Sequence, residues 1–194
     1  MQDPWGMTRP LLLPAVLLGC LAAACALNRP RVKSLRDDAA PNIQFAAPIR
    51  TTISDLNAMP SRCGPAGNHR RGDEELHVYE VVGRITRVKR ERDHDVHVIL
   101  ADPARPADHM IVELEDPDYR GNAESRYRDA LVQARRSFDA LVAEIDAARL
   151  QDLKGLVVKV AGVGFFDMNH FQIGRSRSCL ELHPVLSIEL VEGS

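Results

Sequence analysis

The sequence is short of the features that identify a nucleic-acid-binding or membrane-spanning protein. Aromatic residues make up 5% of its 194 residues, too few for a surface that stacks single-stranded bases. The formal net charge of −2 gives no overall attraction to nucleic acid or to an anionic membrane. We therefore do not expect nucleic acid as a partner, and we expect a membrane as a partner only through the N-terminus.

Motifs of well-defined chemistry are also missing. The sequence has no C-x-x-C and no H-x-x-x-H pair, so spacing alone does not indicate a zinc site. The stretch "GVGFF" at 162–166 holds two glycines, but no third glycine opens a helix after it, which excludes a dinucleotide-binding loop. These glycines instead predict close backbone packing inside a barrel.

What is present begins with a leader, because residues 1–26 have the pattern of a secretory signal peptide. Arg9 precedes the run "LLLPAVLLGCLAAACA", which is apolar at first and then rich in small residues. This run is too short for a comfortable membrane span and is broken by Pro14. "LLGC" and "AAAC" resemble lipoprotein processing sites that would lipidate Cys20 or Cys25. Cleavage after Ala26 and a retained membrane anchor are the alternatives. We expect an exported protein that is periplasmic, lipid-tethered or secreted.

Cysteine usage supports export. Removal of the leader leaves Cys63 and Cys179 as the cysteines able to pair. In an oxidising compartment they favour one disulfide, which would close a long loop and stabilise the fold by about 4–5 kcal/mol in the chain-entropy model. Two unpaired buried thiols are the alternative.

The chain divides into a leader, a tether with an irregular lead-in at 27–70, and a folded domain at 71–194. The folded domain is predicted to be mostly β with one long helix. Strand patterns occupy 76–91, 95–102, 109–115, 155–166 and 179–190. A helix that Asn122 can cap, with apolar residues at spacings of three and four, separates the third strand from the fourth. This order is that of an OB-fold, a five-stranded barrel, although an open α+β sheet would share it.

The first polar cluster is "ERDHDVH", at the turn between the first two strands. Asp95 and His97 lie two apart, so a strand points both the same way, and Asp93 lies in the turn. A carboxylate and an imidazole on one face can hold a divalent cation or transfer a proton. The alternative is an exposed polar face with turn residues.

The second cluster lies at the hairpin of the last two strands. Asp167 and His170 follow the fourth strand, and Glu181 and His183 share a face of the fifth. Pairing of these strands would gather two imidazoles and two carboxylates, a donor set that suits Zn²⁺ or Mn²⁺. In the alternative, Glu181 pairs with a loop arginine and His183 caps the hairpin. Both clusters lie on loops that border the usual OB-fold ligand surface.

The motifs "DHDVH", "GVGFFDMNHFQIG" and "ELHPV" also resemble a family. Residues from about 76 to 190 are similar to uncharacterised, mostly exported bacterial proteins that carry a D-x-D-x-H turn and a GVGFFDxxHxQxG…ELHPV ending. The resemblance implies an OB-like fold and no particular activity. This chain differs from the family pattern at Phe171, where a glycine is usual, and at "RSRSC", which replaces a segment that usually contains proline and asparagine. The residues of this chain that match the shared motifs are Asp93, Asp95, His97, Asp167, His170, Gln172, Glu181 and His183.

Three functions follow from these patterns. The first is an exported binding module for a small ligand or envelope component, with Asp93, Asp95, His97 and Gln172 as ligand contacts. The second is a metal-dependent hydrolase, such as a phosphodiesterase. The third is a structural component of the cell envelope. The "DHD" turn is similar to the "DGDT" turn of staphylococcal-nuclease-like domains, but the arginine and the D-T-P-E-like segment of those domains are missing, so we do not expect nuclease activity.

Overall fold

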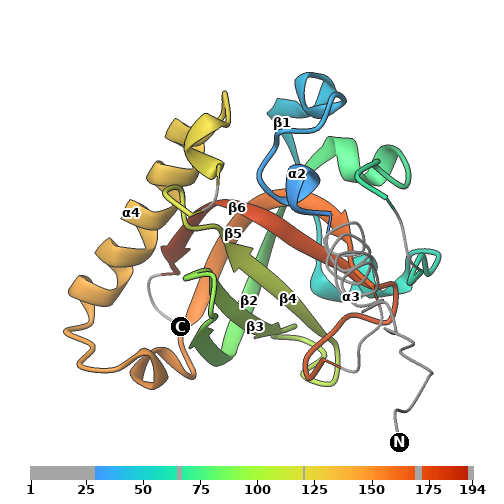
Figure 1. Ribbon diagram of the computed structural model, residues 1–194. Helices are drawn as coiled ribbons and strands as arrows, with labels where there is room; N and C mark the ends of the chain where they lie inside the picture. The colour runs from blue at the N-terminus through green and yellow to red at the C-terminus, as the bar shows by residue number, and fades with distance from the viewer. Residues whose placement is uncertain (1–28, 65–66, 120, 169–171, 192–194) are drawn as a thin grey trace, which may run out of the picture.

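The structure is a computed structural model that describes residues 29–64, 67–119, 121–168 and 172–191. Its strands form one six-stranded sheet in which five close into a barrel, as the sequence predicts (Figure 1). The strands are β1 (Gln44–Arg50), β2 (His77–Arg90), β3 (Val96–Ala101), β4 (His109–Leu114), β5 (Val157–Phe166) and β6 (Leu180–Leu190). The helices are α2 (Pro30–Lys33), α3 (Ile53–Ala58) and α4 (Arg128–Glu144), with short 3₁₀ turns η1 (Ala40–Asn42), η2 (Asp73–Leu76), η3 (Asn122–Glu124) and η4 (Leu150–Leu153).

The barrel closes in the order β2, β3, β4, β6 and β5, with β5 pairing back onto β2. All of these pairs are antiparallel except β4 with β6, which run parallel and align Val112 with Leu182. The sixth strand, β1, adds to the first half of β2 in parallel. The fold is therefore mostly β with one long helix and is OB-fold-like.

The barrel interior is apolar because alternate residues of each strand point inward. On β3 the inward residues are Val96, Val98 and Leu100, each fully buried, as their spacing predicts. The opposite set on the same strand, which includes His97, points outward and is nevertheless buried. Something must therefore cover the outer face of β3.

The long helix differs at its start from the prediction. It begins at Arg128, beyond Asn122, because residues 122–124 form the separate 3₁₀ turn η3 and Ser125 after it is extended, with φ −66° and ψ 131°. The Asn122 Nδ2 donates to Glu115 Oε2 at 2.7 Å and to the carbonyl of Asp116 at 2.8 Å. The predicted apolar stripe is confirmed where the helix packs, since its central members are buried against the barrel. These members are Leu131, Ala134, Phe138 and Leu141.

The N-terminal segment, residues 29–43, is ordered where the sequence predicts a tether and lead-in. Its apolar residues Leu35, Ala40 and Ile43 form a second hydrophobic cluster with Val78 and Val163 on β2 and β5. They lie in turns and in or beside the short 3₁₀ turn η1, so their spacing follows neither the period of a strand nor that of a helix. The sequence therefore gave no periodic signal that this segment packs on the barrel. In Figure 1 this segment, with α2, lies across the front of β5 and β6.

Among the described residues, no helix has the length and apolar character that a membrane span requires. The expected signal peptide at 1–26, with Cys20 and Cys25, lies outside the described residues.

The "GVGFF" glycines pack as expected, and Gly164 allows a strong test. A Cβ on Gly164 would lie 2.8 Å from the Tyr79 ring and would contact the backbone carbonyl of Glu74. We expect Gly164→Ala to lower the free energy of unfolding by about 2–3 kcal/mol through overpacking. Gly64→Ala is the control, because its Cβ would meet nothing within 4 Å. Urea unfolding measures both variants, and equal stabilities would contradict the close packing at Gly164.

Candidate metal centre

A cluster of buried ionisable side chains lies on the outer face of β3, β4 and β6. Its position follows from strand register. His97 of β3 lies directly opposite Glu113 of β4. Because Val112 aligns with Leu182 across the parallel pair, the next residues, Glu113 and His183, share the outer face. Ionisable groups from three strands therefore meet on the surface that OB-folds use for ligands.

His183 is the centre of this cluster. Its Nε2 lies 2.7 Å from Glu115 Oε1, and because a carboxylate accepts, Nε2 donates. Glu115 is itself oriented by the amide of Asn122. Nδ1 of His183 lies 3.0 Å from Glu113 Oε2, a distance suited to an ion pair, but without the alignment of a hydrogen bond. One imidazole nitrogen is thus fixed, and the other faces a carboxylate that does not hold it in a hydrogen bond.

The remaining polar groups of β3 and its turn attach to the same cluster. His97 Nδ1 lies 2.6 Å from Glu113 Oε1, so Glu113 faces one imidazole with each oxygen. Asp95 accepts from the backbone N–H of Asp116 at 2.6 Å. The carboxylate of Asp95 also lies close to Glu115 and His183. The two clusters that the sequence indicates separately therefore converge, through Glu113 and His183.

Glu181 is the exception in an otherwise bonded cluster. Its side chain is 1% exposed, and neither carboxylate oxygen has a hydrogen-bond partner among the described residues. A buried carboxyl group without a partner is costly in free energy, so native proteins seldom retain one without a function. Glu113 and His183 lie beside it, and one donor atom from each of the three lies within 4.8 Å of the others.

The N-terminal segment covers this face and brings positive charge to it. Lys33, at the end of α2, places its Nζ 3.7 Å from Glu113 Oε2. Arg29 lies over the ring of Phe165 at 4.6 Å, and His183 approaches the same ring at 5.4 Å. The guanidinium of Arg29 is anchored by Glu75 in a buried bidentate ion pair of 2.7 and 2.6 Å. This segment covers the part of the face that carries Glu113 and Phe165, whereas on β3 the hairpin loop lies over Ile99, because Gly174 packs directly against the Ile99 side chain.

The charges in the cluster shift its pKa values in opposite directions. Burial and the charge of Lys33 act to lower the pKa of His183, but Glu113 and Glu115 outweigh them and raise it to about 10. Burial opposes ionisation of Glu113, yet Lys33 and His183 hold its pKa well below the usual range. The metal-free cluster thus contains an imidazolium facing an ionised Glu113.

Two other carboxyl groups are shifted upward. Burial, followed by the charges of Asp167 and Glu113, raises the pKa of Glu181 well above its usual value. Burial and Glu115 raise the pKa of Asp95 to about 8. The cluster therefore holds more acidic groups than its cations neutralise, and a further cation would relieve this imbalance.

Three overlapping sets of described residues could each supply three ligand atoms to one metal ion. All of them share Glu113 or His183. The set built on Glu181 combines two buried carboxylates with the buried imidazole of His183. The sets are Glu113, Glu181 and His183; Asp95, Glu115 and His183; and Glu91, His97 and Glu113.

The structure separates the other residues that the sequence singles out. Asp93 accepts from the N–H of Asp95 at 3.4 Å and belongs to none of the three sets. Asp167 is buried and acts on Glu181 through its charge. Gln172 has a buried Oε1 with no hydrogen-bond partner among the described residues. His170 lies outside the described residues.

Sequence reasoning missed several members of the cluster. For Glu113 and Glu115 a signal was present: they alternate with Met110, Val112 and Leu114, so they must share the outer face of their strand. For Lys33 there was none, because its place depends on how the N-terminal segment packs.

The disulfide between Cys63 and Cys179 is confirmed. It joins the loop after α3 to the hairpin loop, two residues before Glu181. The alternative pairing of Glu181 with a loop arginine does not occur: Nη1 of Arg175 lies 2.9 Å from Cys179 Sγ, and Arg177 pairs with Asp108. The hairpin that carries Glu181 is therefore covalently held, and Glu181 keeps no arginine partner.

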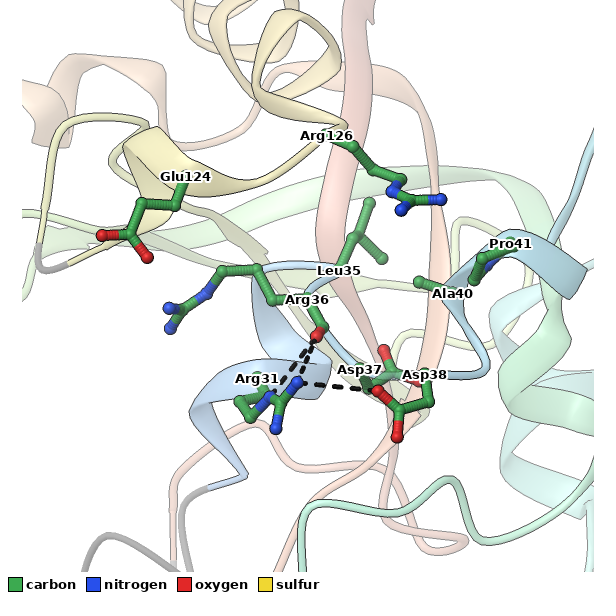
Figure 2. Close-up of a pocket in the computed structure, with 9 residues that line it drawn as sticks. All are labelled: Arg31, Leu35, Arg36, Asp37, Asp38, Ala40, Pro41, Glu124 and Arg126. Atoms are coloured by element: carbon green, nitrogen blue, oxygen red, sulfur yellow. Dashed lines mark hydrogen bonds and ion pairs between the residues drawn. The ribbon is translucent and has the colours of Figure 1, made fainter.

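A separate hollow of about 740 Å³ lies beside the N-terminal segment, between α2, η1 and η3 (Figure 2). At one edge of it, Arg31 contacts Asp38 at 3.6 Å and donates to the carbonyl of Arg36. Its charged lining is balanced, with three arginines and three acidic residues, so it favours no ion of either sign. The lining residues are Arg31, Leu35, Arg36, Asp37, Asp38, Ala40, Pro41, Glu124 and Arg126.

Comparisons with known proteins add little to this geometry. No protein-family model and no curated protein matches the chain. Among solved structures, the chain is similar to apo TiaS, a tRNAIle2 agmatidine synthetase, with 12% identity and a TM-score of 0.25 over 74% of this chain. This chain spans 32% of the length of that structure. A similarity at this level carries no argument about function.

Proposed function

We propose that this protein is an exported, OB-fold-like module that binds one divalent transition-metal ion, Zn²⁺ or Mn²⁺, on the outer face of β4 and β6. The observation that carries the proposal is the fully buried carboxyl group of Glu181, which lies beside Glu113 and His183 and has no hydrogen-bond partner among the described residues. A metal ion between these three side chains would give Glu181 the partner that it lacks.

The donor chemistry supports such a site. Two carboxylates and one imidazole are ligands that Zn²⁺ and Mn²⁺ accept. Metal-binding histidines usually donate their other ring N–H to a carboxylate, which fixes the ring. Nε2 of His183 makes this bond with Glu115, whose other oxygen is held by Asn122. The hydrogen bonds that would orient His183 as a metal ligand are therefore already formed.

Export is part of the proposal and is supported by the disulfide. A disulfide that links Cys63 to Cys179 is favoured in an oxidising compartment. The signal-like residues 1–26 fit this destination, with a lipid at Cys20 or Cys25 as the route to a membrane tether. The excess of buried carboxylates would repel phosphate, so we do not propose a nucleic-acid partner.

We favour binding over catalysis. A metal-dependent hydrolase would use the same ligands but needs a coordination position that substrate can reach. The cluster carboxylates Asp95, Glu113, Glu115 and Glu181 are at most 7% exposed, and His183 is 1% exposed. A hydrolase and a structural envelope protein remain the alternatives to a metal-binding module.

The test is metal binding by tag-free protein that has been stripped with chelator. We expect about one Zn²⁺ or Mn²⁺ per chain by elemental analysis and calorimetry, and a higher melting temperature with metal. Glu181→Gln should weaken binding by about 10–100-fold, because the amide lacks the charge of the carboxylate. It should not lower the stability of the metal-free protein, because Glu181 has no described hydrogen bond to lose.

Glu189→Gln is the matched control, since Glu189 lies on the same strand and pairs with Lys159 at 2.9 Å, on an exposed part of the surface. It should bind metal as the wild type does. The proposal is wrong if stripped wild-type protein binds neither metal. It is also wrong if Glu181→Gln binds metal with wild-type affinity.

A further inference from the structure

We infer that Lys33 is the internal counter-ion of the metal-free site and competes with the metal ion for Glu113. This inference rests on the proposed function and adds a residue that determines the affinity of the site. The inference is based on a contact that does not involve Glu181: the ammonium group of Lys33 lies 3.7 Å from Glu113 Oε2. The same oxygen lies 3.0 Å from His183 Nδ1, and Glu113 and His183 belong to the same set of possible metal ligands.

The backbone of Lys33 is held firmly in this position. Arg29, four residues earlier, is fixed by its buried ion pair with Glu75. Asp37, four residues later, accepts two bonds from Arg70 at 3.0 and 2.8 Å. Val32, between them, is buried. Lys33 therefore reaches the cluster because the segment on both sides of it is anchored to the barrel.

The side chain of Lys33 is positioned to neutralise the cluster. Its Nζ lies 5.3 Å from the centre of the Phe165 ring, so the ring face adds to the attraction of the carboxylates. The charges of Glu113 and its neighbours raise the pKa of Lys33 despite its burial, so the ammonium stays charged. Without a metal ion, Lys33 supplies positive charge that the buried carboxylates require.

A divalent ion bound to Glu113 would repel this ammonium at close range in a region of low dielectric. The side chain of Lys33 is 22% exposed, and its flexible stem lets the ammonium turn toward solvent. Metal binding therefore includes the release of Lys33 from Glu113. The affinity of the site is lower than its ligands alone would give, and the occupied site leaves Lys33 accessible.

The first experiment compares Lys33→Met with Lys33→Arg in metal titrations of stripped protein. Methionine keeps the apolar stem and removes the charge, so we expect about a tenfold or greater gain in Zn²⁺ or Mn²⁺ affinity. Arginine keeps the charge, so its affinity should stay within about threefold of wild type. Lys159→Met is the control for loss of a lysine charge, because Lys159 pairs with Glu189 on an exposed surface.

The second experiment uses wild-type protein and so does not depend on the folding of a variant. Amine-reactive labelling, followed by peptide mass spectrometry, should modify Lys33 weakly without metal. Labelling of Lys33 should rise several-fold on saturation with Zn²⁺, whereas that of Lys89 and Lys159 stays constant.

The results separate the two proposals. Wild-type protein that binds no metal overturns the proposed function and this inference together. Wild-type protein that binds metal, with unchanged or weaker binding by Lys33→Met and unchanged labelling of Lys33, overturns this inference alone. Tighter binding by Lys33→Met with increased labelling of Lys33 supports both.

Discussion

Replacing Arg29 by methionine is expected to lower the free energy of unfolding by about 3–5 kcal/mol. Arg29 and Glu75 form a bidentate ion pair in which both side chains are at most 1% exposed. Removing the guanidinium leaves the carboxylate of Glu75 in the interior without its counter-charge. It also leaves the carbonyl of Phe166, at the end of β5, without the bond from Nη1 at 2.9 Å.

Urea unfolding of metal-free protein measures this loss, and Arg50→Met is the matched control. Arg50 also pairs with a glutamate, Glu80, at 3.0 Å, but its side chain is 87% exposed. Exposed ion pairs contribute at most about 1 kcal/mol, so Arg50→Met should differ little from wild type. Similar small losses in both variants would show that the N-terminal segment is not anchored through Arg29.

The double variant Arg29→Met with Glu75→Met sharpens the interpretation. Replacing both members of a buried ion pair by apolar residues is often tolerated. Here, however, Glu75 also accepts from the backbone N–H groups of Arg71 and Phe166, at 2.6 and 2.7 Å. We therefore expect the double variant to be more stable than Arg29→Met alone, yet less stable than wild type.

Removing the disulfide is expected to have the second large effect. The bond joins Cys63 to Cys179 across a separation of 116 residues. Loss of so long a cross-link frees the unfolded chain, and replacing both cysteines by alanine should lower the free energy of unfolding by about 2–5 kcal/mol. Chemical unfolding under oxidising conditions, with peptide mapping to verify the bond in wild type, measures the loss.

The control for this experiment is reductant. Wild-type protein treated with reductant should approach the stability of the double alanine variant, and the variant itself should not respond. Equal stability of the oxidised wild type and the variant would show that the bond contributes nothing. The same comparison tests the site, because the bond holds the hairpin that carries Glu181, and its loss should also weaken metal binding.

The cost of the buried cluster gives these experiments their functional meaning. Natural proteins can satisfy a strand face more cheaply with apolar residues than with Glu113, Glu181 and His183. A cluster whose cations do not balance its carboxylates is therefore better explained by a ligand than by stability. The anchored N-terminal segment and the disulfide then share one role, which is to hold that cluster away from water.

Much of the barrel could be predicted from the sequence because its signals are local. Alternation of apolar residues at 95–102 and 109–115 predicts strands with one buried face, and these are β3 and β4. The order of five strands and one helix is that of an OB-fold barrel, although an open α+β sheet would share it, and the structure shows the closed barrel. The predicted start of the helix was wrong, because Asn122 has the residue type of a cap but opens only the 3₁₀ turn η3, and the extended Ser125 separates that turn from α4.

The candidate site was only partly predictable, because only some of its residues are neighbours in the chain. Spacing of two on a strand placed Glu181 with His183 and indicated a shared face, and the structure keeps them together on β6. The partners of His183 were not predictable, since Glu113 and Glu115 lie some seventy residues earlier in the chain. Only the parallel pairing of β4 with β6 brings them into contact.

By itself, the sequence determined the five strands of the barrel, the helical stripe, the pair of cysteines and the polar residues that alternate with apolar ones, but not β1, which lies within the predicted lead-in. Each of these depends on neighbours in the chain, through a period of 2 or 3.6 residues or a residue type. The tertiary structure alone decided that the two polar clusters meet at His183 and that the start of the N-terminal segment packs against the face that carries Glu113. It also decided that Lys33 faces Glu113 while Glu181 has no described hydrogen-bond partner. Those contacts depend on register between distant strands and on burial, which no local pattern encodes.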